Sequence, residues 1–205
     1  MRSLRNVAAA YASGLALGLA LIAPIGAQNL FVLEQGLRLG LVRALPAVVA
    51  AGVCDSLLIV LGAGGASALL QGQPGLRDAL VAVGVAFLAL LGLRSLFARA
   101  ESIAAAPAGS RAGVVARTVG VSLLNPHAVL DTVGVIGGAI AAQAASRRAP
   151  FAAGAVTASW LWFLFLAAAA AALQARLSPS ARVWIARASG ALMLAFAVVL
   201  ATRLG

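Results

Sequence analysis

Two short segments of the sequence place a proline beside amide and carboxylate side chains within long apolar stretches. They are Ala-Pro-Ile-Gly-Ala-Gln-Asn at residues 23–29 and Asn-Pro-His-Ala-Val-Leu-Asp at residues 125–131. Amide and carboxylate groups can bind a polar or cationic solute through hydrogen bonds and charge. A proline inside a helix removes a backbone hydrogen bond and clashes with the preceding turn. Each segment therefore predicts an interrupted helix with polar groups at the interruption.

The ends of an interrupted helix supply part of a predicted binding site. The positive end of a half-helix attracts the anionic groups of a substrate. Asn125 followed by Pro126 predicts an N-cap and the first position of a restarting helix. His127 can carry a proton or serve as a hydrogen-bonding wall residue, and the second role is slightly favoured. The predicted substrate-binding residues are Pro24, Gly26, Gln28, Asn29, Asp55, Asn125, Pro126, His127 and Asp131.

Two of the five acidic residues, Asp55 and Asp131, lie well inside apolar stretches. A carboxylate within a bilayer costs about 2.5–3.5 kcal/mol on insertion scales, and such residues usually mark solute pathways or proton relays. Asp55 and Asp131 are therefore predicted to bind a cation and to couple its movement to protons. The alternative is a structural ion pair with Arg94 or Arg117, near the ends of apolar stretches. Glu34 follows the first stretch and is expected to be solvated.

The composition is that of an integral membrane protein. Of the 205 residues, 63% are hydrophobic and 10% are charged, whereas soluble domains carry about 25% charged residues. All 15 basic residues are arginine, and they stand mostly at the ends of apolar stretches, which argues against a nucleic-acid partner. The single cysteine, Cys54, excludes an intramolecular disulfide and a zinc cluster. The sequence has neither a phosphate-binding loop nor a nucleophile elbow, so no enzyme activity and no cofactor are predicted.

Six apolar stretches each approach or exceed the length of about 20 residues that spans a bilayer as a helix. They cover residues 11–33, 44–70, 79–97, 117–145, 151–173 and 183–202. The first is long enough to be a retained span rather than a signal peptide. The alternating pattern of a membrane barrel is absent. The predicted class is therefore an all-α integral membrane protein with six transmembrane helices.

The two proline segments also indicate an internal repeat. Aligning Pro24 with Pro126 brings the second stretch into register with the fifth and the third with the sixth. Three spans per repeat require the halves to insert in opposite directions, which is a transporter architecture. The prediction is one transporter domain over residues 1–205, built as a 3+3 inverted repeat with broken helices one and four. The halves cover about residues 11–98 and 113–203.

Small residues let helices in lipid approach one another closely. Two glycine pairs, Gly14–Gly18 and Gly134–Gly138, have the spacing of one helical turn that such contacts use. Plain packing is favoured over a specific dimer motif, because these pairs are frequent in glycine-rich membrane chains. Trp160 and Trp162 in the fifth stretch are predicted to serve in packing or at the membrane interface rather than in binding.

Together these motifs resemble the lysine/arginine exporter family of bacteria. The motifs are residues 18–36, Cys54-Asp55, residues 124–127 with Leu130-Asp131, and residues 158–163. The resemblance covers nearly the whole chain and implies a secondary active exporter of L-lysine or L-arginine, with several passes through the bacterial inner membrane. Exporters of neutral amino acids in the same superfamily usually have the two prolines without acids at the positions of Asp55 and Asp131. The two acids therefore indicate the basic branch. The connection between the third and fourth stretches is shorter than in some relatives.

The chemistry of a basic amino acid fits these residues. The half-helix ends suit its carboxylate, and Asp55 and Asp131 suit its cationic groups. Exporting a cation from a negative interior costs about 2.3 kcal/mol per 100 mV, and inward movement of protons on one of the acids would offset this cost. A proton-coupled antiporter is therefore predicted.

Two alternatives stay open: an exporter of neutral amino acids or another small metabolite, and a non-transporting channel or scaffold subunit. Membrane lipid surrounds such a chain, and a homo-oligomer is compatible with the sequence. In the six-span arrangement, nine arginines lie on one side and six on the other. Because the richer side is normally cytoplasmic, the count predicts that both termini face the periplasm.

Overall fold

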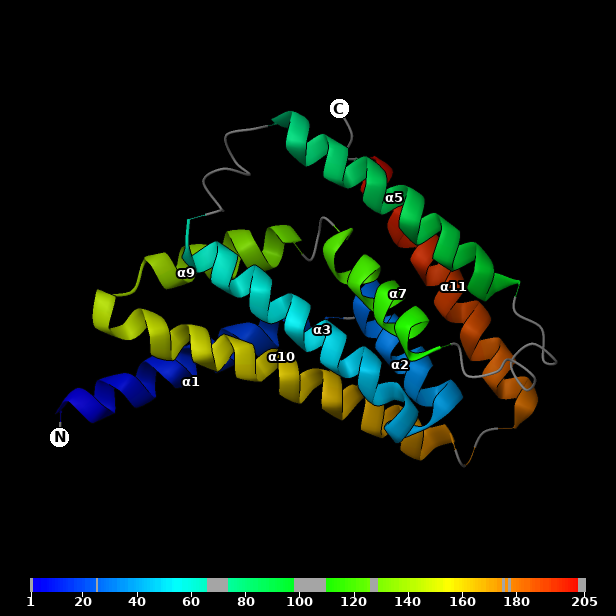
Figure 1. The fold of residues 1–205 in the computed structure, drawn as a ribbon, viewed down its shortest axis with the longest axis horizontal. Helices are drawn as coiled ribbons and strands as arrows, with labels where there is room; N and C mark the ends of the chain where they lie inside the picture. The colour runs from blue at the N-terminus through cyan, green and yellow to red at the C-terminus, as the bar shows by residue number, and fades with distance from the viewer. Residues whose placement is uncertain are drawn as a thin grey trace.

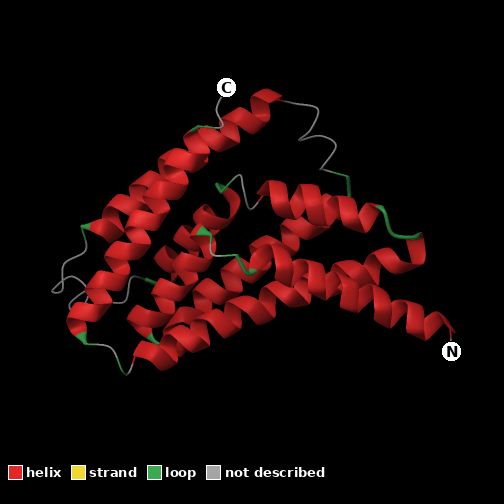
Figure 2. Cartoon of the chain, turned by 180° about the vertical axis from the view of Figure 1, so that it is seen from behind, coloured by secondary structure: helices red, strands yellow, loops and turns green. Residues whose placement is uncertain are grey.

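The computed structural model describes residues 2–24, 26–65, 74–97, 110–125, 129–174, 176 and 178–202. Helices account for most of these residues, and no strand occurs among them. Figure 2 shows the chain from behind, and its described regular elements are all helices. The predicted all-α class is therefore confirmed.

The helices follow one another closely along the chain. In the first half they are α1 (Arg2–Ile22), α2 (Ala27–Leu39), α3 (Leu41–Ala63) and α5 (Pro74–Leu96). In the second half they are α7 (Arg111–Leu123), the π-helix η1 (Leu130–Ile136), α9 (Gly137–Ala141), α10 (Ala145–Gln174) and α11 (Pro179–Ala201). Both α5 and α11 begin with proline, which suits the first helical position because the N–H group there has no intrahelical partner.

Both predicted interruptions are present. In the first half, α1 ends at Ile22 and α2 begins at Ala27, with Gly26 as an extended N-cap. In the second half, α7 ends at Leu123 and η1 begins at Leu130. Pro24 acts as its chemistry requires, since it lies between two helical segments rather than within one.

Within the described part of the chain, three helices are long and apolar enough to cross a membrane. They are Leu4–Ile22, Leu41–Ala63 and Ala145–Gln174. Shorter apolar helical segments are Val85–Leu96, Thr132–Ala141 and Val183–Val199. The predicted start of the first span at residue 11 was wrong, because α1 already begins at Arg2. Its first turns are largely exposed, and the apolar span begins at Leu4 rather than at Tyr11.

The helices form two groups that α2 joins. In Figure 1, the long helix α10 lies along α1 and α3, while α5 and α11 lie side by side as a separate pair. α2 contacts α3 and α10 in the first group and α11 in the second. α7 also contacts both groups, through α3 and α5. The helix that follows the first interruption is therefore central to the fold.

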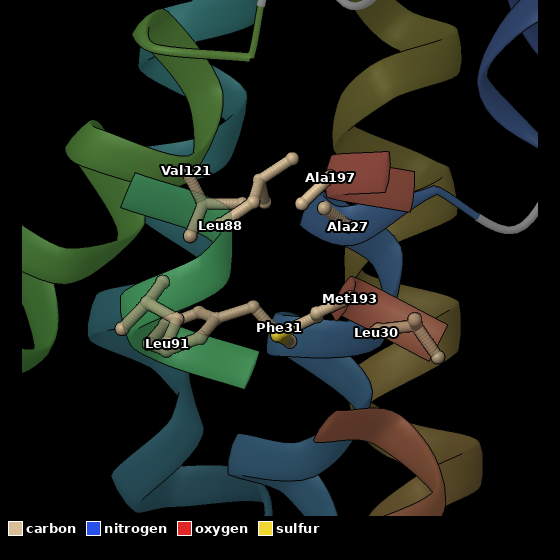
Figure 3. Close-up of a cluster of buried hydrophobic side chains, with 8 residues drawn as sticks. All are labelled: Ala27, Leu30, Phe31, Leu88, Leu91, Val121, Met193 and Ala197. Carbon is tan, nitrogen blue, oxygen red and sulfur yellow. The ribbon is translucent and has the colours of Figure 1, made fainter. Parts of the chain in front are cut away.

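A buried apolar cluster fills the space between the two groups (Figure 3). It contains side chains of α2, α5, α7 and α11: Ala27, Leu30, Phe31, Leu88, Leu91, Val121, Met193 and Ala197. Four helices from both halves of the chain contribute to it. Because packed apolar side chains and small-residue contacts hold helices together in lipid, this cluster positions α2 against the α5–α11 pair.

Close contact between α1 and α10 depends on glycine. A Cβ added at Gly18 would lie 2.7 Å from the Cβ of Ala158, and one at Gly154 would lie 2.7 Å from the backbone nitrogen of Leu15. A Cβ at Gly14 would overlap the carbonyl group of Phe151. The Gly14–Gly18 pair is thus confirmed as a packing contact within the chain.

The second glycine pair does not act in the same way. A Cβ added at Gly134 or Gly138 would meet no described atom within 4 Å. Their neighbour Gly137 makes the close contact instead, because a Cβ there would lie 2.6 Å from the Cα of Gly62 in α3. The helix face of η1 and α9 that packs against α3 therefore differs from the face that the glycine spacing suggested.

Candidate functional site

The side chain of Asn29 hydrogen-bonds the backbone that the first interruption leaves open. Its Nδ2 donates to the carbonyl oxygen of Ile22 at 2.7 Å and to that of Pro24 at 2.8 Å. The last carbonyl groups of a helix have no intrahelical partner, and an unsatisfied buried polar group costs about 1–3 kcal/mol. One buried side chain at the start of α2 therefore stabilises the end of α1.

Trp162 of α10 binds the other polar atom of the Asn29 side chain. Its indole Nε1 donates to Asn29 Oδ1 at 3.2 Å. Both ends of the Asn29 amide are thus engaged by protein groups, which gives Asn29 a role in shaping the interruption. Substrate contact by Asn29 stays a prediction. The role of Trp162 also goes beyond the packing that we expected, since its ring nitrogen ties α10 to the interruption.

Asp55 of α3 and Gln28 of α2 form a buried polar pair. Gln28 Nε2 donates to Asp55 Oδ1 at 3.0 Å. Gln28 is 8% exposed and Asp55 is 3% exposed. Among the described side chains, Asp55 makes no ion pair, so the structural pair with Arg94 or Arg117 is not formed. The carboxylate is therefore held by a neutral donor and can accept a cation that is not part of these helices.

A serine of α10 lies beside the same carboxylate. Ser159 is fully buried next to Asp55, and within the described part of the chain its Oγ has no partner of good hydrogen-bonding geometry. Its neighbour Trp160 donates through Nε1 to Ser56 Oγ of α3 at 3.2 Å. Buried polar atoms are nearly always hydrogen-bonded, so a buried hydroxyl without a partner indicates a position where another group can bind.

Three helices therefore converge on Asp55: α2, α3 and α10. Sequence reasoning found Gln28 and Asp55, but it did not include Ser159 among the binding residues. A signal for it was available, because the run Ser-Trp-Leu-Trp at residues 159–162 places polar groups in an otherwise apolar stretch. A buried carboxylate with an amide and a hydroxyl beside it can bind an ammonium or guanidinium group through charge and hydrogen bonds.

The beginning of α2 is open on the side of the interruption. Pro24 is exposed, and a Cβ added at Gly26 would meet no described atom within 4 Å. No side-chain hydrogen bond caps α2 at Gly26. An uncapped helix N-terminus carries partial positive charge, so it can attract a carboxylate that reaches the open space.

The second interruption is described in part. The carbonyl oxygen of Asn125 accepts a hydrogen bond from the backbone nitrogen of Val129 at 3.1 Å, as the carbonyl of an N-cap residue does. Asn125 is buried at the end of α7. Pro126 and His127, which we predicted to be binding residues, lie outside the described residues.

Asp131 lies on η1, and only its backbone is described. Single π-helical turns are uncommon in proteins, and those that occur are often found at functional sites. η1 packs against α3, the helix that carries Asp55. Leu58 of α3 and Val133 of η1 belong to one buried apolar cluster. The fold thus brings the helices of the two predicted acids into direct contact, although the side chain of Asp131 is outside the description.

The prediction that Glu34 is solvated was wrong. Glu34 is 4% exposed, and its Oε1 accepts a hydrogen bond from Arg38 Nη1 at 3.0 Å in an ion pair. Ser95 Oγ of α5 donates to Glu34 Oε2 at 3.4 Å. The apolar stretch ends before Glu34, but the protein interior continues, because α5 lies against this part of α2.

Known proteins resemble this chain over most of its length. The family described as LysE type translocator matches residues 19–204. The putative amino-acid transporter YisU of Bacillus subtilis is 40% identical over 162 residues, which cover 76% of this chain and 72% of YisU. The putative amino-acid transporter YggA of Aeromonas salmonicida is 42% identical over 179 residues, covering 85% and 82%. The arginine exporter protein ArgO of Klebsiella pneumoniae is 40% identical over 174 residues, covering 82% and 81%.

No solved structure matches the chain. The family match extends over most of the sequence, and each of these relatives is covered over more than two thirds of its own length. The resemblance drawn from the motifs is confirmed. The chain therefore belongs to the LysE type translocator family, so it is a transporter, as its sequence predicted, and not an enzyme.

Proposed function

We propose that this protein is a secondary active exporter of basic amino acids, L-arginine, L-lysine or both. The observation that carries the proposal is the buried Asp55 carboxylate, which accepts a hydrogen bond from the neutral side chain of Gln28 and has the neutral Ser159 beside it. A buried charge is stable when an opposite charge neutralises it. In this proposal, the neutralising charge is the guanidinium or ammonium group of the substrate.

Two further features support a basic amino acid as the substrate. The open, uncapped start of α2 at Gly26 suits the substrate carboxylate. The contact between α3 and η1 supports a joint role for Asp55 and Asp131. Each acid would bind one of the two cationic groups of the basic amino acid. His127, Pro126 and Asn125 complete the proposed site at the second interruption, as the sequence indicates.

The names of the relatives help to define the class of substrate proposed for this chain. ArgO is named an arginine exporter protein, and it is 40% identical to this chain. YisU and YggA are named putative amino-acid transporters. These names support an amino acid as the substrate and favour arginine among the basic ones.

Protons are the proposed coupling ion. A carboxylate in the membrane can bind either a proton or the substrate cation, so Asp55 or Asp131 can exchange one for the other. Such an exchange makes the protein an antiporter, and inward proton flow then offsets the electrical cost of exporting a cation, about 2.3 kcal/mol per 100 mV.

The proposed architecture is a six-span inverted repeat in the bacterial inner membrane. Pro24 and Pro126 are 102 residues apart. Shifting the first half of the sequence by this number aligns α2 with η1 and α9, α3 with α10, and α5 with α11. Some contacts between helices also have a counterpart in which the two halves of the chain exchange roles. α1 packs against α10 as α7 packs against α3, and α2 packs against α10 as η1 and α9 pack against α3. This matched set of contacts supports the 3+3 arrangement.

Transport by the purified protein in liposomes tests the proposal. We expect saturable flux of arginine or lysine that a pH gradient accelerates, and loss of that flux in Asp55→Asn. Asp78→Asn is the matched control, because it removes an acid at the start of α5 and should transport normally. Equal flux of threonine would contradict the basic substrate. Flux that does not saturate, or none at all, would favour a channel or scaffold subunit.

A further inference from the structure

An apolar groove of about 700 Å³ runs between α3 and α7. From α3 it is lined by residues that include Val42, Val49, Val53 and Leu57, and its lining is apolar apart from Arg111 of α7. Val53 and Leu57 are each two positions from Asp55, and residues two apart on a helix do not share a face. The groove therefore lies on a different side of α3 from the Asp55 site.

Several side chains of α3 that line the groove are large, apolar and exposed. Val42 is 78% exposed and Leu57 is 54% exposed, with Val49 and Val53 between them also exposed. In a protein of the membrane, such a surface contacts the acyl chains of lipids. Val42 and Leu57 are 15 residues apart, so at 1.5 Å per residue the groove follows α3 for about 22 Å. One leaflet of hydrocarbon is about 15 Å thick, so the groove can hold the length of an acyl chain.

Arginines stand at one end of this groove. α3 and α7 run in the same direction, because Cys54 lies beside Ser122 and Leu58 packs in one cluster with Leu123. Arg111 precedes Ser122 by eleven residues, and Arg43 precedes Cys54 by the same number. Both arginines are exposed; Arg111 lines the groove, and Arg43 follows Val42, which lines the same end.

This end of the groove lies where α3 and α7 both begin, at Leu41 and Arg111. The N-terminus of α7, with Ser110 as its cap, begins beside it. The end of α10, which α11 follows, lies near the start of α3, because Gln174 Nε2 donates to the carbonyl oxygen of Arg38. On α11, Trp184 is 69% exposed and the guanidinium of Arg187 lies 6.0 Å from its ring. Exposed tryptophan near the start of a spanning helix is typical of the headgroup level.

We propose that the α3–α7 groove binds an anionic phospholipid, with one acyl chain along α3 and its phosphate group at Arg111 and Arg43. The charge of the two arginines complements the phosphate, and basic pockets between membrane helices bind anionic headgroups in this manner. A zwitterionic lipid fills the same groove but leaves the arginine charges without a net negative partner. The inference concerns the membrane partner of the protein and does not depend on which amino acid is exported.

Native mass spectrometry of the delipidated protein tests this site. We expect phosphatidylglycerol to remain bound where phosphatidylcholine does not, and glycerol phosphate alone, which has no acyl chain, to bind too weakly to be detected. Arg111→Gln should weaken phosphatidylglycerol binding about fivefold, the effect of one arginine near an anionic headgroup. Arg147→Gln is the matched control, since it removes an exposed arginine at the start of α10.

A second pair of variants tests the acyl-chain part of the groove. Val53→Trp fills the groove at an exposed position and should displace the lipid, while Val60→Trp changes an exposed residue of α3 outside the groove and should not. Equal binding of both lipids, or unchanged binding by both Arg111→Gln and Val53→Trp, would overturn the proposal. The same spectra report the mass of the complex, and a dimer that Val53→Trp dissociates would assign the groove to a second copy of the chain instead.

Discussion

Gln28 Nε2 lies 3.0 Å from Asp55 Oδ1, and this hydrogen bond connects the start of α2 to the middle of α3. The bond orients one oxygen of the carboxylate, beside which Ser159 of α10 is buried. One side chain therefore links the first interruption to the acid. The pair gives α2, α3 and α10 a common polar centre, and η1 packs against α3.

Replacing Gln28 by leucine tests this connection. Gln28→Leu removes the donor but keeps a side chain of similar size, so the carboxylate loses a partner whose absence costs about 1–3 kcal/mol. We expect the initial rate of arginine transport in liposomes to fall about tenfold or more. Gln143→Leu, after the end of α9, is the control and should transport like the wild type. A wild-type rate for Gln28→Leu would show that the pair has no part in transport.

The two acids can be tested in cells. Cells that overproduce the protein should resist canavanine or thialysine, and Asp55→Asn and Asp131→Asn should each remove that resistance. Both changes keep the side-chain size and remove the charge that attracts a cation. Immunoblots of membrane fractions check that the variants insert, and Asp78→Asn should retain resistance. Full resistance with both variants present in the membrane would exclude the charge mechanism.

Asn29→Ala should destabilise the protein rather than alter its substrate preference. The change leaves the carbonyl groups of Ile22 and Pro24 without their donor. Neither residue is fully buried, so the loss is about 0.5–1.5 kcal/mol for each hydrogen bond. We expect a lower Tm in detergent for Asn29→Ala and a smaller decrease for Trp162→Phe, which removes one hydrogen bond. Because Trp162 donates to Asn29, the double variant should be less unstable than the sum of the two. Strict additivity would mean that the two side chains act independently.

Glycine contacts between α1 and α10 predict a sharp contrast between two conservative changes. Gly154→Ala places a methyl group against the backbone of Tyr11 and Leu15, and such overpacking typically costs about 1–3 kcal/mol. Gly134→Ala adds the same group where a Cβ meets no described atom within 4 Å. We expect a reduced Tm and a smaller yield for Gly154→Ala alone. Equal stability of the two variants would contradict the close approach of α1 and α10.

The interruptions could be predicted because their cause is local. A proline cannot donate a backbone hydrogen bond in any environment, so Pro24, in the middle of a long apolar stretch, predicts an interruption there. Pro46 and Pro150 lie inside α3 and α10, but close to the starts of those helices. The partners of Asn29 could not be predicted in the same way. Its side chain binds Trp162, which lies 133 residues away in sequence, and nothing in the residues near Asn29 specifies that neighbour.

The surroundings of Glu34 and Ser159 also could not be predicted from the residues near them in sequence. Glu34 stands at the edge of an apolar stretch, where hydropathy predicts solvent, but Ser95 of α5 lies against it. Ser159 has the composition of an ordinary small packing residue, but α10 places it beside Asp55. In both cases a helix that is distant in sequence contributes to the burial, although the ion-pair partner of Glu34 is Arg38 of the same helix.

By itself the sequence determined the membrane class, the positions of the two interruptions, the acids within apolar stretches and the family. These follow from hydrophobicity, backbone chemistry and motif order, which are properties of single residues and their near neighbours. The tertiary structure decided that Asn29 closes the end of α1, that Gln28 and Ser159 lie beside Asp55, and that Glu34 is buried. The reason is physical: a polar side chain in a helix bundle is stable only with a partner, and packing between distant helices chooses that partner.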